Sequence, residues 1–145
     1  MSMRKFFYCA GAIVSASLIV ISCNKVGAGE EQDINTIDNS DNTPPVLTIT
    51  KPTANQVYIS GDSIVVDGKV VDEKVMYKGK VQIKNDVTGF VVAENYYETH
   101  FLNTLSFHVA YKAIVTVSTD FSAILEFQDH GANPVTSTIK VKVNP

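Results

Sequence analysis

The chain has 145 residues, a hydrophobic content of 45% and a formal net charge of −3 at pH 7. From Val46 onward, nine lysines are balanced by ten acidic residues, and no basic stripe is present. Binding to nucleic acid requires clustered cations that displace counterions, so this class of function is excluded.

The N-terminus predicts export. Arg4 and Lys5 precede an apolar run from Phe6 to Ile21, which is the pattern of a signal peptide. At roughly 16 residues, the run is shorter than the roughly 20 that span a bilayer as a helix. We therefore expect a cleaved signal over residues 1–22 rather than a permanent anchor.

The end of that run, Val20-Ile21-Ser22-Cys23, resembles the lipobox of bacterial lipoproteins. The resemblance implies a diacylglyceryl group on the Cys23 sulfur, cleavage before Cys23 and a second acylation at the new amino group, which together hold the protein at a membrane. The alternative is an ordinary secretory signal followed by an unmodified thiol. Cys9 leaves with the signal, so no thiol remains for a disulfide or a metal.

Residues 23–45 are predicted to form the lipidated cysteine and a flexible acidic tether. One base, Lys25, stands against five acids, and apolar residues are scarce, so the segment cannot bury enough surface to offset its chain entropy. An acidic run here resembles the export tag of some surface-exposed lipoproteins of Gram-negative bacteria; the alternative is a solvated spacer. Asn24 in place of aspartate disfavours retention at the inner membrane, which points to the outer membrane.

Residues 46–145 show an apolar period of two, which is typical of strands with one buried face. Examples are the runs Ile64 to Val70, Leu105 to Val117, Phe121 to Phe127 and Val135 to Val143. Turn residues separate the runs every 8 to 12 positions or so, which predicts an all-β sandwich of about seven strands.

The same residues resemble bacterial immunoglobulin-like repeats. The resemblance rests on Pro44-Pro45 before a strand, Lys51-Pro52, Ser60-Gly61-Asp62, Val66 to Asp72, and a closing hairpin over Leu125 to Asn133. It implies an immunoglobulin-like antiparallel β-sandwich. One departure is Gly131, which comes one position early in the hairpin and is followed by Ala132. The resemblance does not specify a function, since such modules serve as adhesins, spacers and assembly subunits.

A calcium site is predicted at one end of the sandwich, where the topology brings distant loops together. The residues are Asp72, Glu73, Asp129 and Asn133, because oxygen-rich side chains suit a hard cation. The alternative is that Asp72 and Asp129 only shape their turns through hydrogen bonds to the backbone.

A second candidate group is Tyr96, Tyr97 and His100, placed by the same reasoning in a loop over residues 95–100. These rings are expected to stack on a glycan or pack against a protein partner. The alternative is that they close the end of the core.

Enzymatic chemistry is not expected. Gly61-Asp62-Ser63 matches the nucleophile block of one lipase family over three residues only, and no Asp-x-x-His follows it. The sequence spacing expected of metal ligands is not found among His100, His108 and His130. Two functions remain: a non-catalytic surface binding or adhesion module that acts through loops at one end, or a structural or assembly subunit of a larger envelope complex.

Overall fold

The computed structural model describes residues 36–145, all of which fall in one compact unit, Asp33–Pro145. This part of the chain contains strands and no helix. The strands are β1 (Val46–Lys51), β2 (Val57–Ile59), β3 (Ser63–Val71), β4 (Met76–Asn85), β5 (Val91–Glu98), β6 (Thr104–Lys112), β7 (Thr119–Asp129) and β8 (Pro134–Asn144).

The strands form two sheets, with the orders β1-β3-β6 and β2-β8-β7-β4-β5. All neighbours are antiparallel except the short β2, which runs parallel to β8. The chain passes from the first sheet to the second through a cis Lys51-Pro52 bond and returns with β3. This is an immunoglobulin-like β-sandwich, which confirms the predicted fold class; the described residues form eight strands where about seven were expected.

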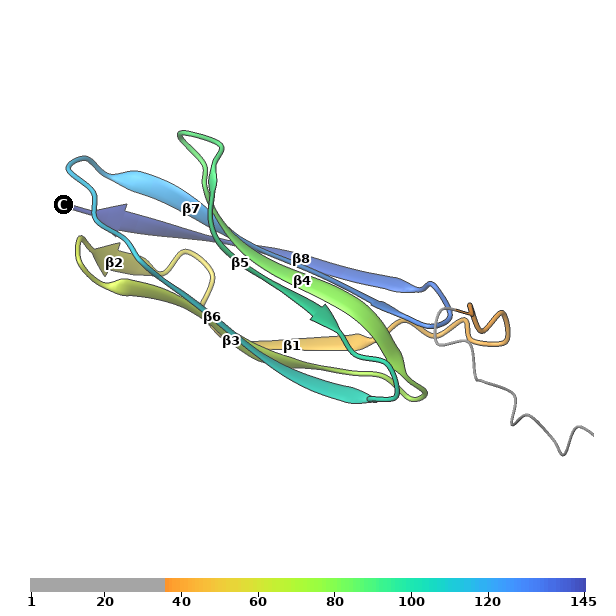
Figure 1. Cartoon of the computed structure of the whole chain (residues 1–145). Coiled ribbons are helices and arrows are strands. Elements are labelled where there is room, and N and C mark those ends of the chain that lie inside the picture. Colours follow the sequence, from red (N-terminus) through yellow and green to blue (C-terminus); the bar gives the residue numbers. More distant parts are fainter. Residues whose placement is uncertain (1–35) are drawn as a thin grey trace, which may run out of the picture. The chain divides into compact units, whose positions relative to one another are not determined.

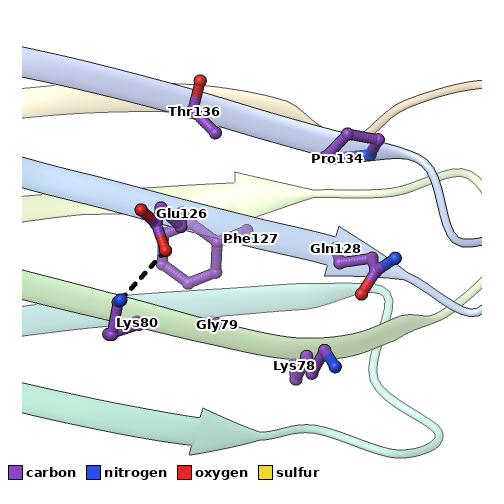
Figure 2. Close-up of a pocket in the computed structure, with 8 residues that line it drawn as sticks. All are labelled: Lys78, Gly79, Lys80, Glu126, Phe127, Gln128, Pro134 and Thr136. Carbon is purple, nitrogen blue, oxygen red and sulfur yellow. Dashed lines mark ion pairs between the residues drawn. The ribbon is translucent and has the colours of Figure 1, made fainter.

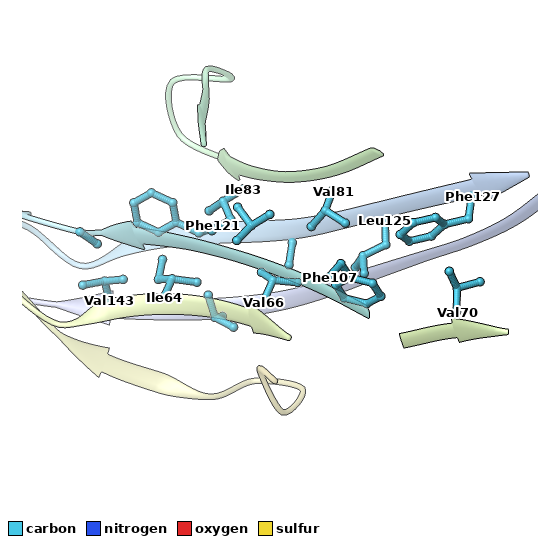
Figure 3. Packing of buried hydrophobic residues seen from close by; sticks show 14 of the residues in the cluster. Ile64, Val66, Val70, Val81, Ile83, Phe107, Phe121, Leu125, Phe127 and Val143 are labelled. Carbon is cyan, nitrogen blue, oxygen red and sulfur yellow. The ribbon is translucent and has the colours of Figure 1, made fainter. Parts of the chain in front are cut away.

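The core lies between the two sheets and follows the period of two (Figure 3). The inward side chains of β3, β4 and β7 are almost fully enclosed, and on β6 the Phe107 ring stacks on Phe127 at 5.4 Å between centroids. Lysines occupy the opposite faces of β4 and β8. The buried apolar residues are Ile64, Val66, Val70, Met76, Val81, Ile83, Phe107, Val109, Ala113, Phe121, Ala123, Leu125, Phe127, Val141 and Val143.

One apolar run was predicted too long. The alternation from Leu105 to Val117 suggests a single strand, but β6 ends at Lys112 and a loop follows. In that loop Ala113 donates its N–H to Asp62, while Val117 is 68% exposed. β6 pairs with β3 only as far as Lys112, which lies opposite Ser63 at the start of β3. The alternation of apolar residues in the sequence therefore continues beyond the last paired residue.

Three connections meet at one end of the sandwich, which we call the loop end. The sequence predicted this meeting, but it placed one of the three loops at residues 95–100. The loop end comprises residues 72–75, 99–103 and 130–133. The amide of His130 donates to the Val75 carbonyl at 3.2 Å, and that of Met76 donates to the Leu102 carbonyl at 2.7 Å. These bonds fix the three connections relative to one another.

Residues 36–45, which we call the entry segment, lie against the loop end before the chain enters β1 (orange in Figure 1). The amide of Asp38 donates to the His130 carbonyl at 2.8 Å, and both Asp41 and Pro45 are buried. Part of the segment expected to be a flexible tether is therefore packed on the domain.

The predicted signal peptide, Cys23 and the first part of the tether lie outside the described residues. Within residues 36–145, no helix has the length and apolar character needed to cross a membrane.

Candidate metal centre

Three aspartates come together at the loop end. Asp72 follows β3, Asp129 ends β7, and Asp41 belongs to the entry segment. They are only 4%, 0% and 3% exposed, and one carboxylate oxygen of each lies within 4.8 Å of one from each of the others. Burying like charges together is unfavourable unless something compensates them.

Hydrogen bonds satisfy only part of this cluster. Asp129 accepts from Asn133 at both oxygens, from the backbone N–H at 2.8 Å and from the side-chain amide at 2.9 Å. One oxygen of Asp72 accepts from the Lys74 amide at 2.8 Å, and one of Asp41 accepts from the Thr43 amide at 3.1 Å. The second oxygens of Asp41 and Asp72 are buried without a hydrogen-bond partner among the described residues.

The electrostatics of the cluster favour an added positive charge. Burial raises the pKa of Asp72, and the charges of Asp129, Asp41 and Glu73 raise it further, against the opposing effect of the Lys74 amide. The Lys74 ammonium lies 3.0 Å from Asp38 and also donates to Ser40, on the exposed surface. Its charge is therefore shared with a carboxylate outside the cluster.

The donor set suits a hard divalent cation. Calcium takes six to eight oxygen ligands at about 2.3–2.6 Å, so two ligands of one ion can be separated by up to about 5 Å. The spacing within the cluster is inside that limit. Three carboxylates would supply three to six of those oxygens, and neither sulfur nor imidazole belongs to the set. Asp41, Asp72 and Asp129 could thus hold calcium.

The structure brings together only some of the residues predicted for calcium. Asp72 and Asp129 lie in the cluster, but Glu73 is exposed and does not belong to it. Asn133 turns its amide nitrogen toward the cluster, where it donates to Asp129 and to the Asp41 carbonyl at 3.1 Å. A donor nitrogen cannot ligate a cation, so Asn133 is not a ligand through this atom. Its hydrogen bonds instead position Asp129 and Asp41.

Asp41 was missed by the sequence analysis, which assigned it to the tether. One sequence feature could have indicated it. Asp41 lies shortly before Pro44-Pro45 and β1, and β1 begins at the end of the sandwich where Asp72 follows β3, because Val46 pairs with Val71.

The predicted aromatic group is divided by the structure. Residues 95–98 belong to β5 and not to a loop, so the predicted placement was wrong for both tyrosines. Tyr96 is 69% exposed on the outer face of the larger sheet, whereas Tyr97 points inward and packs on Phe127, with ring centroids 6.2 Å apart. Alternation along a strand forces two neighbouring side chains to opposite faces.

His100 lies apart from Tyr96, in the connection before β6. Its Nδ1 is 3.2 Å from Nε2 of His130, and the Tyr77 ring lies against both imidazoles, with centroids 5.3 and 4.9 Å away. The residue after it, Phe101, has a φ of 70°, which is unusual for a bulky side chain. Here His100 helps to cover the loop end.

A shallow hollow of about 380 Å³ lies on the outer face of the larger sheet (Figure 2). Its polar side chains come from alternate positions of neighbouring strands, because their side chains point to the same face. The Lys80 ammonium lies 3.0 Å from the Glu126 carboxylate. Tyr96 is the β5 neighbour of Lys80 and so borders this area. The lining residues are Lys78, Gly79, Lys80, Glu126, Phe127, Gln128, Pro134 and Thr136.

Ser63 has no catalytic surroundings in the described part of the chain. It begins β3, at the end of that strand opposite Asp72, and pairs with Lys112. His108 instead bonds to Asp67, further along the same strand pair.

Comparisons with known proteins identify no family. No protein-family model and no curated protein sequence matches the chain. Among solved structures, it is similar to CopC from Methylosinus trichosporium OB3b (13% identity, 69% of this chain and 95% of that chain, TM-score 0.44). It is also similar to fibronectin(III)-like modules of Clostridium thermocellum CbhA (14%, 69% and 46%, TM-score 0.43) and to the periplasmic chaperone SfaE (14%, 70% and 56%, TM-score 0.44). The fold assignment rests on the strand order described above.

Replacing Asp72 with asparagine should stabilise the metal-free protein at pH 7. The folded-state pKa of Asp72 is raised above 3.8, so its charge opposes folding at neutral pH. This cost disappears as pH falls through the raised pKa, because the folded state then binds the additional proton. Urea unfolding in a chelator should therefore show Asp72→Asn more stable than wild type at pH 7, with a smaller difference at pH 4.

The exposed neighbour provides the control, since Glu73→Gln should change stability little at either pH. An Asp72→Asn protein that is less stable than wild type in chelator at pH 7 would show that the ionised carboxylate is stabilised within the cluster.

Proposed function

We propose that this protein is a non-catalytic, lipid-anchored module of the cell envelope whose β-sandwich binds calcium at Asp41, Asp72 and Asp129. The observation that supports calcium binding is the pair of buried carboxylate oxygens, on Asp41 and Asp72, that lack a partner among the described residues. A divalent cation would satisfy both oxygens and neutralise the repulsion that the cluster otherwise carries.

Calcium should raise the melting temperature of the purified domain. A ligand that binds only the folded state at 100 times its dissociation constant stabilises it by about 2.7 kcal/mol, which corresponds to roughly 10 °C or more for a domain of this size. Differential scanning calorimetry with millimolar calcium, compared with chelator, measures the shift. Asp72→Asn should lose most of it.

Glu73→Gln is the matched control, because Glu73 adjoins Asp72 in sequence but lies outside the cluster. Its calcium shift should equal that of wild type. Equal melting temperatures for the wild-type protein in calcium and in chelator would refute calcium binding.

The anchor is proposed from the sequence, since Cys23 lies outside the described residues. A lipid on Cys23 would place the sandwich at the envelope, with the outer membrane as the expected location. After expression of the full chain in a bacterium, mass spectrometry should find a diacylglyceryl group and an added acyl chain on the N-terminal Cys23. Cys23→Ala should leave the membrane fraction, whereas Cys9→Ala should remain there; an unmodified Cys23 in the native protein would contradict the anchor.

Recognition of a glycan on the outer face of the larger sheet is a second candidate function. The supporting observation is that Tyr96, 69% exposed, borders a hollow whose Lys80 and Glu126 neutralise each other and whose Gln128 and Thr136 offer hydrogen bonds. An exposed ring beside hydrogen-bonding groups suits the apolar face and the hydroxyls of a sugar, and the lining also carries the exposed Lys78. This surface lies on strands, whereas the sequence analysis expected loops.

Tyr96→Ala should lower affinity for bound polysaccharide fragments on a glycan array at least tenfold, because the stacking surface is lost. Phe90→Ala is the control, since Phe90 is 72% exposed but lies in the β4–β5 turn. Binding that survives Tyr96→Ala would reject this face. Co-purification of one fixed envelope protein, whatever residue occupies position 96, would instead support the assembly-subunit alternative.

A further inference from the structure

The three ligands proposed for calcium differ in how firmly the protein holds them. Asp129 is the last residue of β7, where it pairs with Met76, and the Asp72 amide donates to the Asn103 carbonyl at 2.9 Å. Asp41 belongs to no strand. It is therefore the carboxylate that can leave the cluster at the lowest cost to the sandwich.

Few bonds hold the entry segment otherwise. Among the described residues, its one backbone hydrogen bond to the sandwich runs from the Asp38 amide to the His130 carbonyl. Asn133 donates to the Asp41 carbonyl, and His130 Nδ1 lies 3.4 Å from the Thr36 carbonyl oxygen. Lys74 contacts Asp38 and Ser40 on the exposed surface, where solvent screens an ion pair. Repulsion among three buried carboxylates acts against this small set of contacts.

The turn between β7 and β8 is shaped to admit the segment. A Cβ on Gly131 would come within 2.6 Å of the Asp41 carbonyl oxygen and 2.7 Å of its Cβ. The glycine that departs from the immunoglobulin-like pattern thus lies where Asp41 approaches. With glycine at this position, Asp41 can lie against the turn beside Asp129.

We propose that calcium controls the free length of the tether between the membrane anchor and the sandwich. When calcium is bound, the entry segment stays on the loop end; when calcium is removed, the segment is released. This inference rests on the proposed calcium site and on the proposed lipid at Cys23. Release of the entry segment would add ten residues to the distance that the chain can cover before the sandwich, which is at most about 35 Å when they are fully extended. The ion would thereby set how far the domain reaches from the bilayer.

Hydrogen–deuterium exchange of the full lipoprotein in detergent micelles, followed by mass spectrometry, tests the inference. In calcium, peptides covering residues 37–45 should exchange slowly; in chelator, exchange should be faster by tenfold or more. If only the docked form binds calcium, the ratio of docked to released molecules rises by a factor of one plus the calcium concentration divided by its dissociation constant. At a calcium concentration of 100 times that constant, this ratio should rise about 100-fold. Peptides from β6 should not respond.

Two variants sharpen the test. Asp41→Asn keeps the shape of the side chain and removes its charge, so its segment should stay protected with or without calcium. Glu73→Gln removes a neighbouring acid outside the cluster and the entry segment, and its calcium response should match that of wild type.

The outcomes separate the two proposals. If calorimetry detects no calcium binding, the metal centre itself fails. If calcium binds but residues 37–45 exchange at the same rate in calcium and in chelator, the calcium site is supported and the control of tether length is overturned.

Discussion

The arrangement of the loop end depends on three buried carboxylates, each with one oxygen within 4.8 Å of an oxygen of the other two. Hydrogen bonds satisfy Asp129 fully but leave one oxygen each on Asp41 and Asp72 without a partner among the described residues. A buried charge that lacks compensation costs several kcal/mol in typical proteins, whereas a bound divalent ion converts the same groups into ligands. The stability of the loop end therefore depends on the protonation state of Asp72, whose pKa is raised.

The sandwich provides the rigidity that such a cluster requires. The larger sheet places Asp129 at the end of β7, and its pairing with β4 fixes the turn that carries Asn133. The smaller sheet places Asp72 after β3. Ladder bonds and the enclosed core therefore hold the backbone at two of the three acids, Asp72 and Asp129. The third is attached through a segment with few bonds, which couples the cluster to the part of the chain that leads back to Cys23.

The loop end and the outer face of the larger sheet are distinct surfaces. The loop end is covered by the entry segment and by the Tyr77, His100 and His130 rings. The outer face carries Tyr96 and the polar hollow, and no described segment packs on its exposed tyrosine ring. The proposed calcium site and the proposed recognition surface are thus separate parts of one small domain.

The amino-acid sequence by itself determined the all-β class, the inward faces of β3 and β7, and the gathering of Asp72 with Asp129. These follow from local period and from a topology that few alternatives satisfy. Only the tertiary structure decided where β6 ends, which of Tyr96 and Tyr97 is exposed, and that Asp41 completes the cluster while Glu73 does not. The physical reason is that a polar segment such as residues 36–45 has no period of its own, so its position depends on contacts with residues 34 to 94 positions away in the sequence.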